Sequence, residues 1–123
     1  MMLAIAIDRD SVHAGDDLSG HASSIKLDPT ATLRALFEAI QTMHYLPCIK
    51  GDEATWVISA SGKQIGVLAQ QWTAPKLVVS LESLVKQVFG EHEPRLLFKY
   101  WCQTNPDVVF SRIEAGELLP SRY

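Results

Sequence analysis

The sequence predicts an α+β fold with a mainly antiparallel sheet and two or three helices packed on one side. Apolar residues alternate with small or polar ones near the N-terminus and again over residues 95–102, as they do in half-buried strands. A Ser61-Gly62 pair separates two apolar runs, which is typical of a hairpin turn. The strand and helix patterns do not alternate strictly, which disfavours a purely parallel sheet. At 123 residues, the chain is expected to form a single domain over residues 1–123.

The first element is a strand over residues 2–8, where apolar side chains at positions 3, 5 and 7 alternate with Ala4 and Ala6. The small face of this strand leaves room for a helix to pack closely. Residues 9–27 follow as a long loop that contains Gly15, Gly20 and most of the acidic residues nearby. A loop of this length in a compact domain is usually functional or mobile.

Asp28-Pro29 is predicted to open the first helix, because Asp at the N-cap and Pro at the first helical position are a favoured pair. The helix should end near His44 or Tyr45. Its apolar stripe recurs at steps of three and four residues and comprises Leu33, Leu36, Phe37, Ile40 and Met43.

A hairpin of strands 55–60 and 63–72 comes next, and residues 77–79 are either a further short strand or the approach to a helix. Ser80 is the expected N-cap of a second helix that runs through Phe89 and stops at Gly90. Residues 95–102 are the last strong strand. Asn105-Pro106 begins a short third helix, which Gly116 ends.

The charge of the chain is concentrated at its N-terminus. Asp8, Asp10, Asp16 and Asp17 stand against a single Arg9 in the first 24 residues and account for the net charge of −3, while the rest of the chain is balanced. Such an acidic segment suits a basic partner. The absence of a basic stripe argues against direct nucleic-acid binding.

Neither a membrane span nor a signal peptide is expected from the short apolar start, so no membrane association and a cytoplasmic location are predicted. Cys48 and Cys102 are expected to stay reduced.

The segment 8–21 contains four aspartates together with His13 and His21. Such a set could bind Ca²⁺, Mg²⁺, Zn²⁺ or Mn²⁺, but the spacing fits no EF-hand, since that loop needs Gly and Glu where His13 and Ser19 stand. An exposed acidic loop and a loop that binds a partner through charge-assisted hydrogen bonds are the other interpretations. No nucleophile elbow, phosphate loop or dinucleotide motif is present, so neither catalytic residues nor a cofactor are predicted.

Three tryptophans, Trp56, Trp72 and Trp101, lie on predicted strands and are expected mainly in the core, although a carbohydrate or base-stacking platform would use the same residue type. Tyr45, at the end of the first helix, either caps the core or faces a partner. Tyr45, Trp72 and Trp101 are the candidates for an apolar centre of a binding surface.

The segments DRDSVHAGDD, ATWVI and AQQW resemble those of bacterial immunity proteins, the antitoxin-like inhibitors of polymorphic toxins in contact-dependent growth inhibition systems. The resemblance covers about half of the chain. It implies a 1:1 complex with the toxin domain of a secreted protein, often a nuclease, which the immunity protein neutralises by occlusion, without catalysis. The partner-binding residues would then be Asp8, Asp10, Asp16, Asp17, Tyr45, Trp72 and Trp101.

Two alternatives remain open at this point. The loop 8–21 could make the chain a small metal-dependent enzyme, in which His13 or His21 would be required for metal binding. A homodimeric structural protein that buries one face of its sheet is the other.

Overall fold

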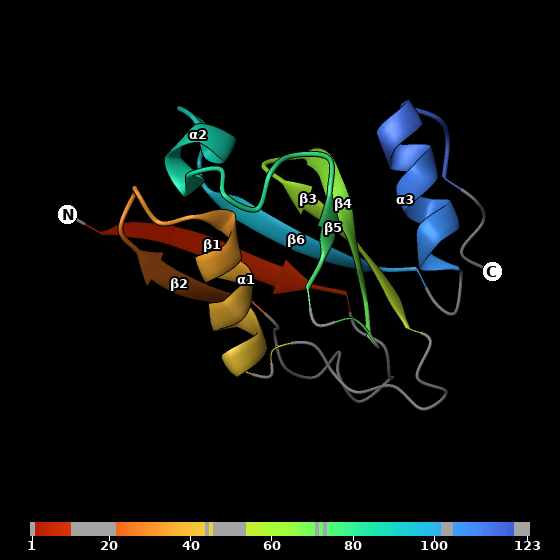
Figure 1. Cartoon of the computed structure of the whole chain (residues 1–123). Coiled ribbons are helices and arrows are strands. Elements are labelled where there is room, and N and C mark those ends of the chain that lie inside the picture. The colour runs from red at the N-terminus through yellow and green to blue at the C-terminus, as the bar shows by residue number, and fades with distance from the viewer. Residues whose placement is uncertain are drawn as a thin grey trace.

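The computed structural model describes residues 2–10, 22–43, 45, 54–70, 72, 74–101 and 105–119. These residues form one mixed, mostly antiparallel sheet with three helices (Figure 1). The elements are β1 (Leu3–Arg9), β2 (Ser23–Leu27), α1 (Leu33–Thr42), β3 (Thr55–Ala60), β4 (Lys63–Ala69), β5 (Lys76–Leu77), α2 (Val85–Phe89), β6 (Arg95–Tyr100) and α3 (Pro106–Ala115). The predicted α+β class is confirmed.

The strands lie in the order β2-β1-β6-β3-β4-β5. The last strand, β6, is inserted between β1 and β3, parallel to β1 and antiparallel to β3. All other neighbouring pairs are antiparallel. The first and last strands of the chain are therefore adjacent at the centre of the sheet.

The two faces of the sheet carry different helices. On one face, α1 and α2 cover the main core, which includes Ile5, Ile7, Phe37, Trp56 and Phe98. On the other face, α3 packs against β4 and β3 around a smaller cluster of Val57, Val67 and Val109. Two helices thus share one side, as predicted, and the third lies on the opposite side, apart from them in Figure 1.

Side-chain alternation explains why β1 and β6 take the centre. Ile5, Ile7, Leu96 and Phe98 are fully buried under α1 and α2, while the residues between them face the other side of the sheet. Phe98 also meets the Phe37 ring edge-on at 6.4 Å between ring centroids. The strands predicted for 2–8 and 95–102 are confirmed to within two residues at each end.

One predicted loop contains a strand. Residues 23–27, assigned by sequence to the loop 9–27, form β2 and pair with β1, with Ile25 opposite Ile5. The segment SSIKL has only two apolar residues, and Ile25 and Leu27 are half-buried. Its strand conformation therefore depends on pairing with β1 rather than on its own pattern.

The start of α1 was also predicted wrongly, because Asp28 caps a separate turn. The Asp28 carboxylate accepts hydrogen bonds from the Thr30 backbone N–H at 2.8 Å and from the Thr30 hydroxyl at 2.6 Å, and the latter keeps the pKa of Asp28 below its usual value. Thr32 is the N-cap of α1, and its hydroxyl oxygen accepts from Ala35 N–H.

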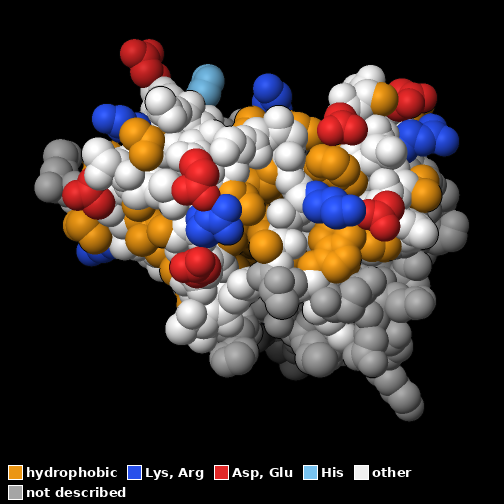
Figure 2. All heavy atoms as spheres, in the orientation of Figure 1, with side chains coloured by type: hydrophobic (Ala, Val, Ile, Leu, Met, Phe, Trp, Pro, Cys, Tyr) orange, Lys and Arg blue, Asp and Glu red, His pale blue; other side chains and the backbone are white. Residues whose placement is uncertain are grey.

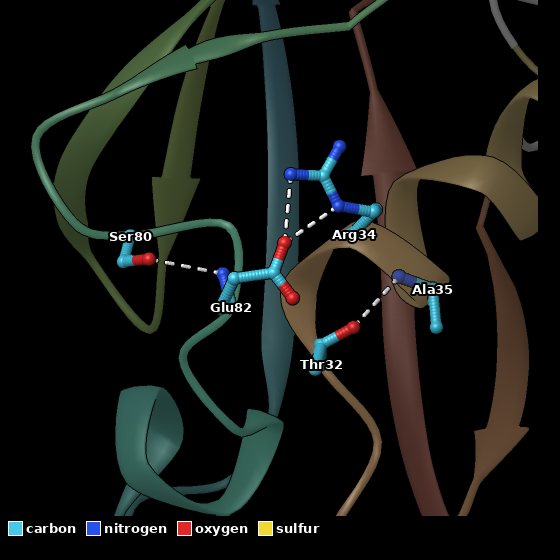
Figure 3. Close-up of polar contacts among 5 residues, drawn as sticks. All are labelled: Thr32, Arg34, Ala35, Ser80 and Glu82. Carbon is cyan, nitrogen blue, oxygen red and sulfur yellow. Dashed lines mark hydrogen bonds and ion pairs between the residues drawn. The ribbon is translucent and has the colours of Figure 1, made fainter.

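Residues 80–84 complete the N-terminus of α1. The carbonyls of Ser83 and Leu81 accept hydrogen bonds from the Leu33 and Arg34 N–H groups at 2.9 Å, which satisfies donors that the first turn cannot pair internally. The Arg34 guanidinium also bonds to the Glu82 carboxylate at 2.7 Å, as Figure 3 shows. This use of residues 80–84 explains why α2 begins at Val85, with Leu84 as N-cap, and not at Ser80 as predicted.

The remaining ends follow the sequence closely, except that β4 ends at Ala69 and not at residue 72 as predicted. The hairpin turn at Ser61-Gly62 has positive φ at both residues, as its two-residue length requires. Gly90 ends α2, and α3 begins at the Asn105 cap and ends at Gly116 in the left-handed region, as predicted. In the described part of the chain, none of the helices combines the length and apolar character needed to span a bilayer.

Candidate binding surface

Three strands stop at the same end of the sheet. Since β1 and β6 are parallel, Arg9 and Phe98 lie side by side, and β4 ends at Ala69 opposite Thr55, the first residue of β3. We call this end, where β1, β4 and β6 finish, the exit end. Most of the described partner-binding candidates from the sequence lie at it or directly beyond it.

Asp8 and Asp10 differ in their surroundings. Asp8 is exposed on the face opposite α1, and its carboxylate accepts a hydrogen bond from the neighbouring Arg9 N–H at 2.8 Å. Asp10 is half-buried and continues the pairing of β1 with β6. Its N–H donates to the Phe98 carbonyl and its carboxylate accepts from the Tyr100 N–H, both at 3.0 Å. The Asp10 side chain therefore holds the last residue of β6, and Asp8 presents the more accessible charge.

Tyr45 follows the end of α1 and packs against the main core. Its ring centroid lies 6.3 Å from that of Phe98, and the tyrosine remains half-buried. Burial raises the pKa of Tyr45 to about 12, and the negative charge of Asp8 adds to this effect. Both interpretations offered for Tyr45 are thus compatible with its position, since it contacts the core and keeps part of its surface accessible.

Trp72 and Trp101 lie beside the cluster under α3. Trp72 is held by its backbone N–H, which donates to the Ala69 carbonyl just past the end of β4. Trp101 directly follows β6 and donates its N–H to the Thr55 carbonyl at 2.7 Å. Both indoles are half-buried, whereas Trp56 is fully buried in the main core, as expected for a core tryptophan.

Lys76 was not singled out from the sequence. Its ammonium group lies 4.8 Å from the ring centroid of Trp72 and 2.5 Å from the Asp107 carboxylate in the first turn of α3. This arrangement joins β5, Trp72 and α3 through one cation. No local signal could have identified it, because the position of α3 over β4 is set by tertiary packing.

The other sequence candidates lie outside the described residues. Asp16, Asp17, His13 and His21 belong to this group, so the structure tests neither the alternative of a metal site in the loop 8–21 nor the predicted acidic loop. Among the residues that the structure does describe, there is no group of three or more His, Cys, Asp or Glu side chains that could hold a metal ion.

Charges on the face that carries α1 and α2 are mixed. Figure 2 shows acidic and basic side chains interspersed there with hydrophobic ones. A hollow of about 230 Å³ lies on this face between α1 and residues 74–81, lined in part by Arg34, Glu38 and Pro75. Its charges of both signs give it no preference for a cationic or an anionic ligand.

Comparison with known proteins finds no matching family model, no similar curated protein and no similar solved structure.

Proposed function

We propose that this protein is a non-catalytic inhibitor of the immunity-protein type, which binds a cognate bacterial toxin domain, a nuclease in our expectation, and occludes its basic cleft. The observation that supports this proposal best is the gathering of residues 8, 10, 45, 72 and 101 around the exit end, although they are far apart in the sequence. The chain leaves the described residues at Asp10 and returns at Ala22, with Asp16 and Asp17 between them.

The composition of the exit end suits a protein interface. Half-buried aromatic side chains are the residues that most often anchor protein–protein complexes, and charged groups at the rim increase the association rate. Tyr45 contributes from the α1 face and Trp101 from the α3 face. Asp8 adds an exposed carboxylate, which a nuclease cleft evolved for phosphates would attract.

The test uses the C-terminal domain of an exported protein encoded next to this chain, with the association rate measured at low and high salt. We expect the Asp8→Asn, Asp16→Asn, Asp17→Asn triple variant to associate about tenfold more slowly than wild type at low salt, with the difference shrinking at high salt. Asp10 is left unchanged, because its carboxylate also holds the backbone of Tyr100.

A matched control removes three negative charges elsewhere. Glu91, Glu114 and Glu117 are exposed, and a triple Gln variant at these positions has the same net charge as the Asp variant. This control should associate at nearly the wild-type rate. Equal slowing of both variants would attribute the effect to net charge alone, and an unchanged rate in the Asp variant would remove the acidic segment from the docking surface.

A further inference from the structure

One half of the sheet is open on the side opposite α1. Because α3 packs on β4 and β3, the outer surface of β2, β1 and β6 stays accessible, and its exposed residues alternate with the buried core residues of the same strands. We call this surface the open face; it is formed by Ser24 and Lys26 of β2, Ala4, Ala6 and Asp8 of β1, Arg95, Leu97 and Lys99 of β6, and Ser59 of β3.

The open face contains a hollow of about 520 Å³. Ala6 and Leu97 line it, and Arg95 and Lys99 from β6 border it. Ser59, which is only 7% exposed, also lines it.

Positive charge predominates on the open face. Lys26, Arg95 and Lys99 are all exposed and stand against a single carboxylate on the same strands, Asp8. Arg95 is also 3.7 Å from Glu93, but that pair is largely exposed and holds the guanidinium weakly. The sign is opposite to that of the acidic N-terminal segment, so the open face suits a different partner group.

The arrangement of the cations matches a helix lying along β1. Lys26 is beside Ala4 on β2, and Arg95 is beside Ala6 on β6, so the two cations flank a floor of small residues. Strands two places apart are separated by about 10 Å, which is the width of an α-helix. Alanine at both floor positions permits close approach, and α3 already packs as a helix on the neighbouring half of this side.

The spacing disfavours two other ligands. Arg95 and Lys99 are four residues apart on one strand, about 13 Å, which is too far for one small anion to bridge. No aromatic side chain belongs to the open face, so it offers no platform on which nucleic-acid bases could stack. Carboxylates seven residues apart on one side of a helix are separated by roughly 10.5 Å, and flexible Glu, Arg and Lys side chains span the remaining difference to the pair of cations.

We infer that the open face binds an acidic helix of a protein partner, with small residues of that helix on Ala4 and Ala6 and its carboxylates paired with Lys26, Arg95 and Lys99. This inference goes beyond the proposed function. It uses the side of the sheet next to the exit end, with which it shares Asp8, and positive instead of negative charge. The two proposals are tested with different ligands and different variants.

The experiment uses a stapled, alanine-rich helical peptide with two Glu residues seven positions apart on one flank and a third Glu on the other. A matched peptide carries Lys in place of Glu. Amide resonances of the ¹⁵N-labelled protein are followed during titration. We expect the Glu peptide to shift resonances of the open face, with Ala6 and Leu97 among them, and the Lys peptide to leave them unchanged.

Charge reversal supplies the decisive comparison. Arg95→Glu with Lys99→Glu should weaken binding of the Glu peptide about tenfold or more and create binding of the Lys peptide. Lys86→Glu with Arg112→Glu changes the net charge equally on α2 and α3 and should leave the affinity unchanged. Spectra of the free variants verify that both pairs leave the fold intact.

The inference would be overturned by an absence of shifts at saturating Glu peptide or by shifts centred on another surface. Equal binding of the Lys peptide, or displacement of the Glu peptide by a single-stranded oligonucleotide, would overturn it as well. Concentration-dependent shifts of the open face without any peptide would also overturn it, since they would assign this surface to a second copy of the chain. None of these results bears on the association test at the exit end.

Discussion

Replacing Asp10 with alanine tests whether its carboxylate stabilises the fold, in addition to adding negative charge to the acidic N-terminal segment. In the structure the Asp10 carboxylate accepts from the half-buried Tyr100 N–H at 3.0 Å, across 90 positions of sequence. Asp8→Ala is the matched control, because it removes the same kind of side chain two residues earlier in the chain, on β1.

The expected magnitude follows from the hydrogen bond. A hydrogen bond to a charged group contributes about 1.5–3 kcal/mol, and removing the acceptor leaves a partly buried N–H without its partner. We therefore expect Asp10→Ala to lower the free energy of unfolding by about 2 kcal/mol. The exposed Asp8 carboxylate bonds to the adjacent Arg9 N–H, and its loss should cost less than about 0.5 kcal/mol.

Urea unfolding followed by tryptophan fluorescence measures both variants, and amide hydrogen exchange locates the change. The Tyr100 amide should lose protection in Asp10→Ala and keep it in Asp8→Ala. Equal stabilities of the two variants, with Tyr100 equally protected, would refute the argument. They would show that the Asp10 carboxylate does not stabilise the fold.

Three further outcomes are expected. Gly66→Ala should destabilise the protein by about 1–3 kcal/mol in urea unfolding, because an added Cβ would clash with the Lys76 carbonyl oxygen; a loss below about 0.5 kcal/mol would contradict this. The raised pKa of Tyr45, about 12, means that the folded state holds this proton more tightly than the unfolded chain. Its contribution to stability is complete below pH 10 and is lost as the pH rises towards 12, and ultraviolet titration should show a late-titrating tyrosine that is missing in Tyr45→Phe. Asn105→Ala should cost about 1 kcal/mol and weaken exchange protection in the first turn of α3, since its side chain caps two N–H groups there; unchanged protection would argue against the cap.

Sequence patterns within a few residues were sufficient to predict the elements whose own residues form the turn or the caps. The hairpin was placed correctly because Ser61-Gly62 adopts the positive φ angles of a two-residue turn, and α3 because Asn105 and Gly116 cap it with their own side chain and backbone. Trp56 was expected in the core from its apolar neighbours and is buried there.

The candidate surface was predictable only in part. Asp8 and the aromatic residues could be nominated individually, since residue type and exposure tendencies are local properties. Their gathering at the exit end depends on the insertion of β6 between β1 and β3, which pairs segments about 90 residues apart. The alternation of Arg95 and Lys99 with Leu96 and Phe98 indicates an exposed basic side of the last strand. It does not indicate that small residues of β1 lie between this strand and β2, because that arrangement depends on strand pairing.

The sequence by itself determined the fold class, the strand faces and the turns, because periodicity and capping act within a few residues. Tertiary structure decided that residues 23–27 form an edge strand, and that α1 starts at Leu33, where backbone carbonyls of residues 81 and 83 satisfy its first N–H groups. It also decided that Asp10 turns towards Tyr100 while Asp8 faces solvent. The physical reason is the same in each case: a backbone donor or acceptor must find a partner, and the chain supplies that partner from a distant segment which no local pattern identifies.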